Sequence, residues 1–128
     1  MRRACFLTPL VAEHLPSGRW RLKSPLKYQS LIVEWIVSVP KGFETDFASV
    51  PRLPLAYLLA GDTAHEAAVV HDFLYSSGIC PRQEADAIFF EAIGVLDEPG
   101  WRRWAMWSAV RAGGGAAWRK YRKLAPPE

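Results

Sequence analysis

The stretch AHEAAVVHDFLYSSGICPRQEADAIFFEAI, residues 64–93, decides the fold of this chain. It holds two apolar runs of helical length, separated only by a short break around Gly78 and Pro81. A break this short between two helices predicts an antiparallel helical hairpin. We expect the first helix over residues 64–77 and the second to begin near residue 82.

The sequence before this hairpin has a different character. Residues 1–46 are rich in β-branched and aromatic residues with turn signals, and apolar and polar residues partly alternate in WRLK and IVEWIVSV. This pattern predicts a small antiparallel sheet with one buried face. A loop over residues 47–62 leads to a helical half, residues 63–124. The predicted fold is one α+β domain over residues 1–128, with the sheet packed on the hairpin and a Trp-rich helix.

The composition fits this interpretation, since half of the 128 residues are hydrophobic and 23% are charged. Two cysteines are too few for a disulfide framework, which favours a reducing compartment. The net charge is only +3, yet residues 101–127 hold seven Arg or Lys and no Asp or Glu. Such a basic block suits an anionic surface or the solvated face of a terminal helix. Specific nucleic-acid binding is not expected, because no recognition motif accompanies the block.

A third helix is expected from near Pro99. Trp101, Trp104 and Trp107 recur in it at every third residue. Such a stripe faces a protein core more often than it forms a membrane wedge, so we expect these side chains to face the core.

The hairpin brings polar residues together. His71 and Tyr75 are four residues apart and share one face of the first helix. Asp86 stands at nearly the same height on the second helix, because His71 and Asp86 lie at similar distances from the break. We therefore expect His71 to lie within hydrogen-bonding reach of Asp86, with Tyr75 pointing to the same carboxylate.

This arrangement has a chemistry. A carboxylate that holds one imidazole nitrogen leaves the other to take a proton from water, so His71 and Asp86 outline a water-activating site. Asp72, turned about 100° away, could ligate a hard cation such as calcium together with loop carbonyls. The alternative that the residues leave open is a buried polar network without a catalytic role.

The pattern HDxxY in AHEAAVVHDFLY, followed by EADAIFF, resembles the catalytic helix pair of phospholipase A2, especially its disulfide-poor forms in bacteria and parvovirus capsid proteins. The resemblance covers residues 61–93. It implies that His71 is the general base and Asp86 its partner. It also implies that Asp72 binds calcium and that Tyr75 supports the pair. The glycine-rich calcium loop of phospholipase A2 has no clear counterpart in this sequence.

A second resemblance covers residues 39–118. The segments GFETDFASVPR, AAVVHDFLY and RQEADAIFFEAIG, in this order, are similar to a family of small uncharacterised proteins encoded by tailed bacteriophages and prophages. This implies a phage origin but no activity. It also draws attention to Asp46 and Arg52. Because an arginine fork suits a carboxylate, we expect at least one of the two to reach the His71–Asp86 cluster.

Two function classes follow from these patterns. In the first, the chain is a phospholipase A2-like hydrolase that attacks membrane phospholipid during phage entry or release, with the basic C-terminus on an anionic membrane surface. In the second, it is a non-catalytic component of the virion tail or tail tip, and its partners are other phage virion proteins. In both, we expect the chain in the bacterial host cytoplasm or in the phage particle.

Overall fold

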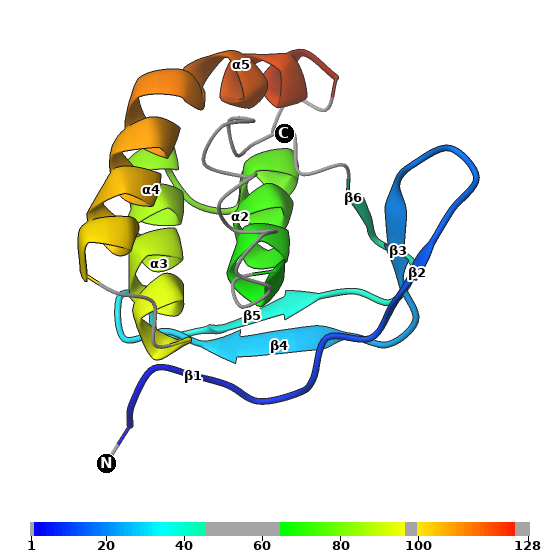
Figure 1. Cartoon of the computed structure of the whole chain (residues 1–128), viewed down its shortest axis with the longest axis horizontal. Coiled ribbons are helices and arrows are strands. Elements are labelled where there is room, and N and C mark those ends of the chain that lie inside the picture. Colours follow the sequence, from blue (N-terminus) through cyan, green and yellow to red (C-terminus); the bar gives the residue numbers. More distant parts are fainter. Residues whose placement is uncertain (1, 46–64, 97–99, 125–128) are drawn as a thin grey trace.

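The structure is a computed structural model that describes residues 2–45, 65–96 and 100–124. Across these ranges the strands form two antiparallel sheets of three strands each, in the orders β1-β4-β5 and β2-β3-β6. The strands are β1 (Cys5–Phe6), β2 (Ala12–His14), β3 (Trp20–Leu22), β4 (Leu26–Gln29), β5 (Ile36–Val39) and β6 (Glu44–Thr45). In Figure 1, β4 and β5 run beneath the helices, and the β2–β3 hairpin lies to their right.

The helices of the described ranges are α2 (His65–Ser77), α3 (Arg82–Val95), α4 (Gly100–Gly113) and α5 (Gly115–Leu124). The helix α2 is central, because it packs on α3 and α5 and on the strands β4, β5 and β6. Its residues 67–72 are all buried, so α2 has no solvated face over this stretch. No helix in the described part of the chain is both long and apolar enough to cross a membrane.

The first sheet covers one side of α2 through an alternating pattern. Leu26 and Tyr28 of β4 are buried, and so are Val37 and Val39 of β5, while Lys27 between the first two is exposed. Successive side chains of a strand point to opposite faces, so the buried residues form one apolar face. This face packs against α2.

The break between α2 and α3 has the geometry of a tight helical hairpin. Gly78 follows α2 with a φ of 65°, which glycine adopts without the strain that other residues meet there. Its N–H donates to the carbonyl of Leu74 at 3.1 Å. Pro81 is extended and precedes the first turn of α3. The two helices therefore lie side by side (Figure 1).

The predicted α+β class is confirmed. The helix expected over residues 64–77 is observed over His65–Ser77, and the next helix begins at Arg82 as expected. The strands divide between two small sheets, because β2, β3 and β6 pair with one another and not with β1, β4 or β5. The connecting loop predicted over residues 47–62 lies outside the described residues.

The expectation that the tryptophan stripe faces the core is wrong. Trp101 and Trp104 are 69% and 58% exposed. The core face of α4 is made by Met106 and Val110, four residues apart. Trp104 packs instead on Phe90 of α3, with ring centroids 4.8 Å apart.

Glu91 of α3 fastens the first sheet to the helices. Its Oε1 accepts a hydrogen bond from the buried Tyr28 hydroxyl at 2.7 Å, and its Oε2 accepts one from the Leu31 N–H at 3.0 Å. Burial, and then the bond to Glu91, raise the pKa of Tyr28 above its usual range, so this hydroxyl remains a donor.

We predict that Glu91→Ala lowers the free energy of unfolding by about 2 kcal/mol, because it leaves a buried hydroxyl without its acceptor. The control is Glu13→Ala, which removes an exposed ion pair with Arg21 at 3.1 Å and should cost less than about 1 kcal/mol. Urea denaturation followed by circular dichroism measures both. Equal losses in the two variants would contradict this role of Glu91.

Candidate functional site

The hairpin places His71 against Asp86. His71 Nε2 lies 2.7 Å from Asp86 Oδ1, and both side chains are fully buried. An ionised carboxylate only accepts hydrogen bonds, so the imidazole Nε2 is the donor here. The expected contact is therefore present in the structure.

Tyr75 joins the same carboxylate from one helical turn further along α2. Its hydroxyl donates to Asp86 Oδ1 at 2.7 Å and accepts a hydrogen bond from Arg82 Nε at 3.0 Å. Burial, and then the bond to Asp86, raise the pKa of Tyr75 above its usual range, so the phenol stays protonated. The Tyr75 ring also packs on the His71 ring, with centroids 4.2 Å apart.

Two arginines that the sequence reasoning missed complete the cluster. Arg111 of α4 donates from Nη1 to Asp86 Oδ2 at 2.8 Å. Arg82, four residues before Asp86, holds its Nε 3.8 Å from the same oxygen. Its Nη2 donates to the carbonyls of Val110 and Arg111, each at 2.8 Å, and so ties α3 to the last turn of α4. Arg82 and Asp86 are four residues apart on one helix, and this spacing was a local signal in the sequence for the contact of Arg82.

The electrostatics of Asp86 follow from these contacts. Burial alone would raise the pKa of this carboxyl. The hydrogen bond and charge of His71, with the bonds from Tyr75 and Arg111, outweigh burial and hold the pKa below its usual range. Asp86 is therefore a fully ionised acceptor at neutral pH.

Asp72 forms a second, separate contact on α2. Its Oδ2 accepts a hydrogen bond from the Thr45 hydroxyl of β6 at 2.6 Å, and its Oδ1 accepts one from the Tyr121 hydroxyl of α5 at 3.0 Å. Asp72 is also buried. This side chain thus joins β6, α2 and α5.

The calcium prediction joins Asp72 to backbone carbonyls of the preceding loop. The Asp72 carboxylate is held by two hydroxyl donors, and the loop over residues 47–62 lies outside the described residues. In residues 2–45, 65–96 and 100–124 there is no group of three or more His, Cys, Asp or Glu that could hold a metal ion. Asp46 and Arg52, expected to support the cluster, lie outside the described residues.

The basic C-terminal block is used partly inside the molecule. Arg122 of α5 donates from Nη2 to the carbonyls of Tyr75 and Ser76 at 2.6 and 3.0 Å, so it caps the end of α2. Its guanidinium also lies 4.5 Å from the centre of the Trp118 ring. Trp118 in turn packs edge-on against Tyr75. Arg111 and Arg122, both partly buried, therefore take part in the helix junction.

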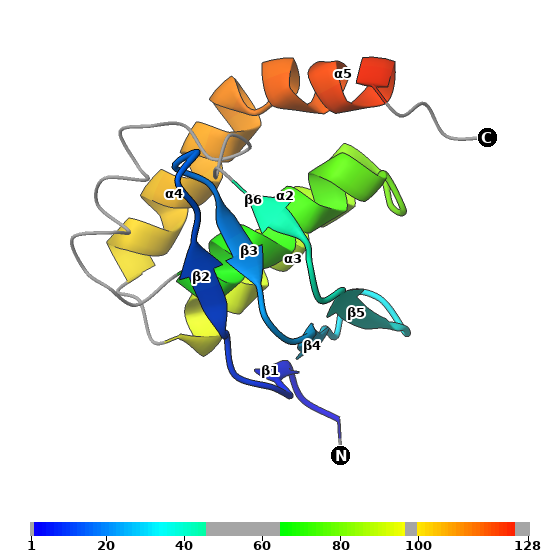
Figure 2. The ribbon, with the colours of Figure 1, turned by 90° about the vertical axis from the view of Figure 1, so that its right-hand side faces the viewer.

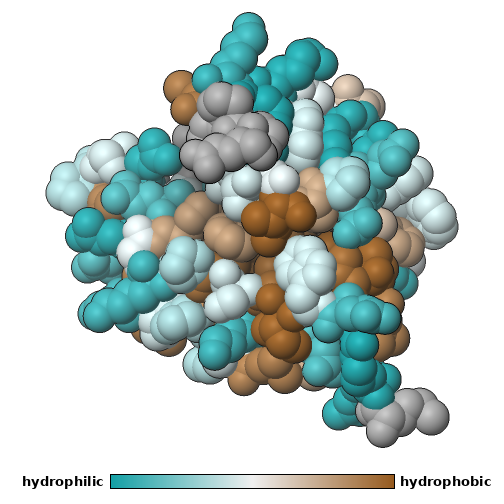
Figure 3. Space-filling view, turned by 180° about the vertical axis from the view of Figure 1, so that it is seen from behind, coloured by the Kyte–Doolittle hydropathy of each residue, from teal (hydrophilic) through white to brown (hydrophobic). Residues whose placement is uncertain are grey.

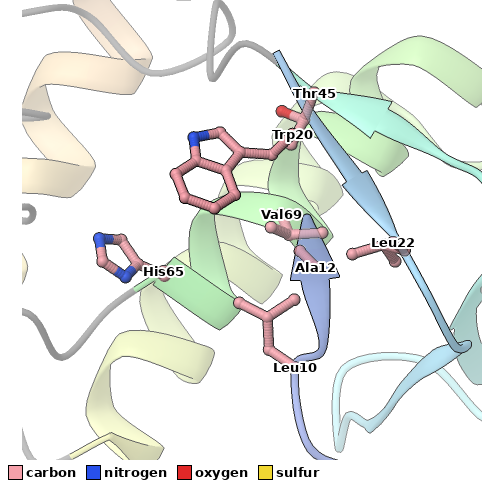
Figure 4. A pocket seen from close by; sticks show the side chains of 7 residues that line it. All are labelled: Leu10, Ala12, Trp20, Leu22, Thr45, His65 and Val69. Carbon is pink, nitrogen blue, oxygen red and sulfur yellow. The ribbon is translucent and has the colours of Figure 1, made fainter. Parts of the chain in front are cut away.

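A cavity of about 250 Å³ lies between the second sheet and the start of α2 (Figure 4). Its lining is mostly apolar, with Thr45 and His65 as polar members. Among the described residues, those that line it are Leu10, Ala12, Trp20, Leu22, Thr45, His65 and Val69. Neither His71 nor Asp86 is among them, so this cavity does not give access to the pair.

The comparison with protein families places the chain. A family model described as a protein of unknown function (DUF1353) matches residues 20–110. The chain belongs to this family. The DUF1353 match contains His71, Tyr75 and Asp86 but ends one residue before Arg111. No curated protein and no solved structure matches the chain.

We predict that Asp86→Asn lowers the free energy of unfolding by about 3 kcal/mol at pH 7, since it leaves buried donors without their charged acceptor. The folded pKa of Asp86 lies below its unfolded value of about 3.9. Its contribution is therefore complete above about pH 4 and is lost as the pH falls through the folded pKa.

The control for this prediction is Glu84→Gln, which makes the same change of charge on the same helix at a partly exposed position. Urea denaturation from pH 7 to pH 2.5 should show a smaller loss of stability on acidification in Asp86→Asn than in the native chain and Glu84→Gln. Identical pH dependence in all three chains would mean that Asp86 carries no such stabilisation.

Proposed function

We propose that this member of the DUF1353 family is a non-catalytic component of a phage particle. In this proposal His71, Tyr75, Asp72 and Asp86 hold the helices together and perform no reaction. One observation carries it: the Asp86 carboxylate is fully buried and accepts hydrogen bonds from an imidazole, a phenol and a guanidinium.

Burial supports this proposal because a general base must reach its substrate. His71 is fully buried, and its ring packs between those of Tyr75 and Phe89, with centroids 4.2 and 4.8 Å away. The cavity of about 250 Å³ is lined by other described residues. An attacking water would have to reach the other ring nitrogen of His71, and a side chain with no exposed surface offers it no route from solvent.

The charge around Asp86 supports the same conclusion. During general-base catalysis, a carboxylate assists by stabilising the imidazolium that forms when the histidine takes a proton. Here Arg111 already neutralises Asp86 at 2.8 Å, and Arg82 is 3.8 Å away. The carboxylate therefore offers His71 less stabilisation than an aspartate that serves the histidine alone.

The phage setting of the proposal rests on the sequence resemblance. The segments GFETDFASVPR, AAVVHDFLY and RQEADAIFFEAIG stand in the order typical of small phage and prophage proteins. Large exposed apolar side chains, such as Trp101, Trp104 and Leu31, are features of a surface covered by neighbours in an assembly. The partners in this proposal are other virion proteins, and the place of synthesis is the host cytoplasm.

The second candidate is a phospholipase A2-like hydrolase, and the geometry of the histidine favours it. His71 Nε2 and the Tyr75 hydroxyl meet on the same oxygen of Asp86, each at 2.7 Å, as the resemblance to the phospholipase helix pair implies. In this candidate His71 would be the general base, oriented by Asp86. A measurement of phospholipid hydrolysis separates the two candidates.

We predict that the purified chain releases no fatty acid from anionic phospholipid vesicles above the protein-free rate, with calcium or with a chelator. The readout is titration of released fatty acid. Calcium-dependent release that is lost in His71→Gln and Asp86→Asn, and kept in the exposed control His14→Gln, would contradict the non-catalytic proposal.

The positive test is mass spectrometry of purified particles of a phage that encodes the chain, where we expect a fixed copy number. Its absence from such particles would contradict the virion role.

A further inference from the structure

Among the described residues, the first sheet ends at β5, which pairs only with β4. The strand order is β1-β4-β5, and Figure 2 shows β5 at the margin of the molecule with no further strand beside it. An edge strand presents backbone N–H and C=O groups that another strand can pair with. The question is which groups of β5 face outward.

The contacts of β4 answer this question. The backbone N–H and C=O groups of Lys27 face β1. The carbonyl accepts a hydrogen bond from the Leu7 N–H at 2.8 Å, and the N–H donates to the Thr8 hydroxyl at 2.9 Å. Backbone groups alternate in direction along a strand, so the flanking residues of β4 face β5. Their cross-strand partners are Val37 and Val39. The N–H and C=O groups of the β5 residues that alternate with these two valines therefore point away from β4.

These outward residues are Ile36 and Ser38. Within the described part of the chain, their backbone groups make no hydrogen bond besides this strand's own ladder. Both side chains are exposed. The bend before β5 adds further large apolar side chains, which are Leu31 at 55% exposure, Ile32 at 42% and Trp35 at 38%. Seen from behind, the side that carries β5 has hydrophobic surface around its centre and lower part (Figure 3).

This apolar bend is held in place by the rest of the fold. The Leu31 N–H donates to Glu91 Oε2 at 3.0 Å. Arg2 donates from Nη2 to the carbonyls of Ser30 and Val33 at 2.7 and 3.0 Å. A surface fixed in this way loses little conformational entropy when a partner covers it.

We propose that β5 is the dimerisation strand of this protein and that it pairs antiparallel with β5 of a second copy. A two-fold axis at Val37 sets Ile36 opposite Ser38 of the second copy, and Ser38 opposite Ile36 of the second copy. Both residues direct their N–H and C=O groups outward, so each such pair forms two hydrogen bonds. The result is a continuous sheet of six strands, three from each copy.

Charge supports a second copy as the partner. Glu34 precedes β5 by two residues and Lys41 follows it by two, so an axis at Val37 sets Glu34 and Lys41 of the second copy at the same end of the paired strands. Both side chains are exposed, and neither makes an ion pair within the described residues. The two-fold axis repeats the contact, so the dimer gains two pairs of opposite charge. A self-complementary surface of this kind is what two-fold symmetry requires.

The ends of β5 limit the pairing to a dimer. Pro40 follows the strand directly and has no N–H to extend the ladder. Residues 31–35 form a bend before the strand. Because the contact uses the same surface on both copies, it closes after two chains and does not propagate into a filament.

The test is sedimentation equilibrium of the full chain from about 1 to 100 μM, with Ser38→Pro beside the control Ser38→Ala. Proline at residue 38 removes an outward N–H and leaves the bonds to β4 intact, as proline does on edge strands. We expect the native chain and Ser38→Ala to dimerise and Ser38→Pro to be monomeric with unchanged circular dichroism. A native chain that stays monomeric at 100 μM, or an Ser38→Pro variant that dimerises as the native chain does, would overturn the proposal.

A charge exchange tests the register and does not depend on proline. Glu34→Lys alone and Lys41→Glu alone should each raise the dimer dissociation constant roughly tenfold, because attraction becomes repulsion at two symmetric contacts. The double variant should restore the native value. If Ser38→Pro fails to fold, hydrogen exchange of the native chain decides, since the amides of Ile36 and Ser38 must gain protection as the concentration rises. No rescue in the double variant would rule out this register, and unchanged exchange would point to a strand of another protein or to no partner.

Discussion

The buried charge of Asp86 is the constraint on which the helical half depends. An ionised carboxylate without water is costly unless donors surround it, and here the hydrogen-bond donors come from the two helices beside α3. His71 and Tyr75 belong to α2 and Arg111 to α4, while Arg82 of α3 adds its charge at 3.8 Å. Because each donor must stay within hydrogen-bonding distance of one carboxylate, this group fixes the positions of α2, α3 and α4 relative to one another.

The same logic repeats on the other side of α2. Asp72 faces away from Asp86 and accepts hydroxyl donors from Thr45 of β6 and Tyr121 of α5. Arg122 then joins α5 to the carbonyls at the end of α2. Asp72 thus binds β6 and α5, which Asp86 does not contact. A His-Asp dipeptide in the fully buried stretch of α2, residues 67–72, connects both halves of the fold.

Part of this arrangement could be predicted from the sequence, since it is local. A short break between two helices fixes their relative height, and this is enough to pair His71 with Asp86 and to direct Tyr75 to the same oxygen. The contact between Arg111 and Asp86 could not be predicted, because it joins residues 25 apart and depends on how α4 returns along α3. The division of the strands between two sheets was equally hidden, since strands of two to four residues carry too little pattern to specify their partners. The expectation from the tryptophan spacing failed for a related reason. The spacing shows that the tryptophans share one face of α4 but not which face is buried, and the buried face carries Met106 and Val110.

If Asp86 holds the helices as one unit, removing its charge must loosen all of them together. Native-state hydrogen exchange of the native chain and Asp86→Asn, read amide by amide, tests this most directly. We expect amides in the central turns of α2, α3 and α4 to lose protection by similar factors in the variant, with α5 following through its contacts to α2. If only the amides next to residue 86 exchange faster and those of α4 keep their native protection, the account of Asp86 as the common anchor of the helices is wrong.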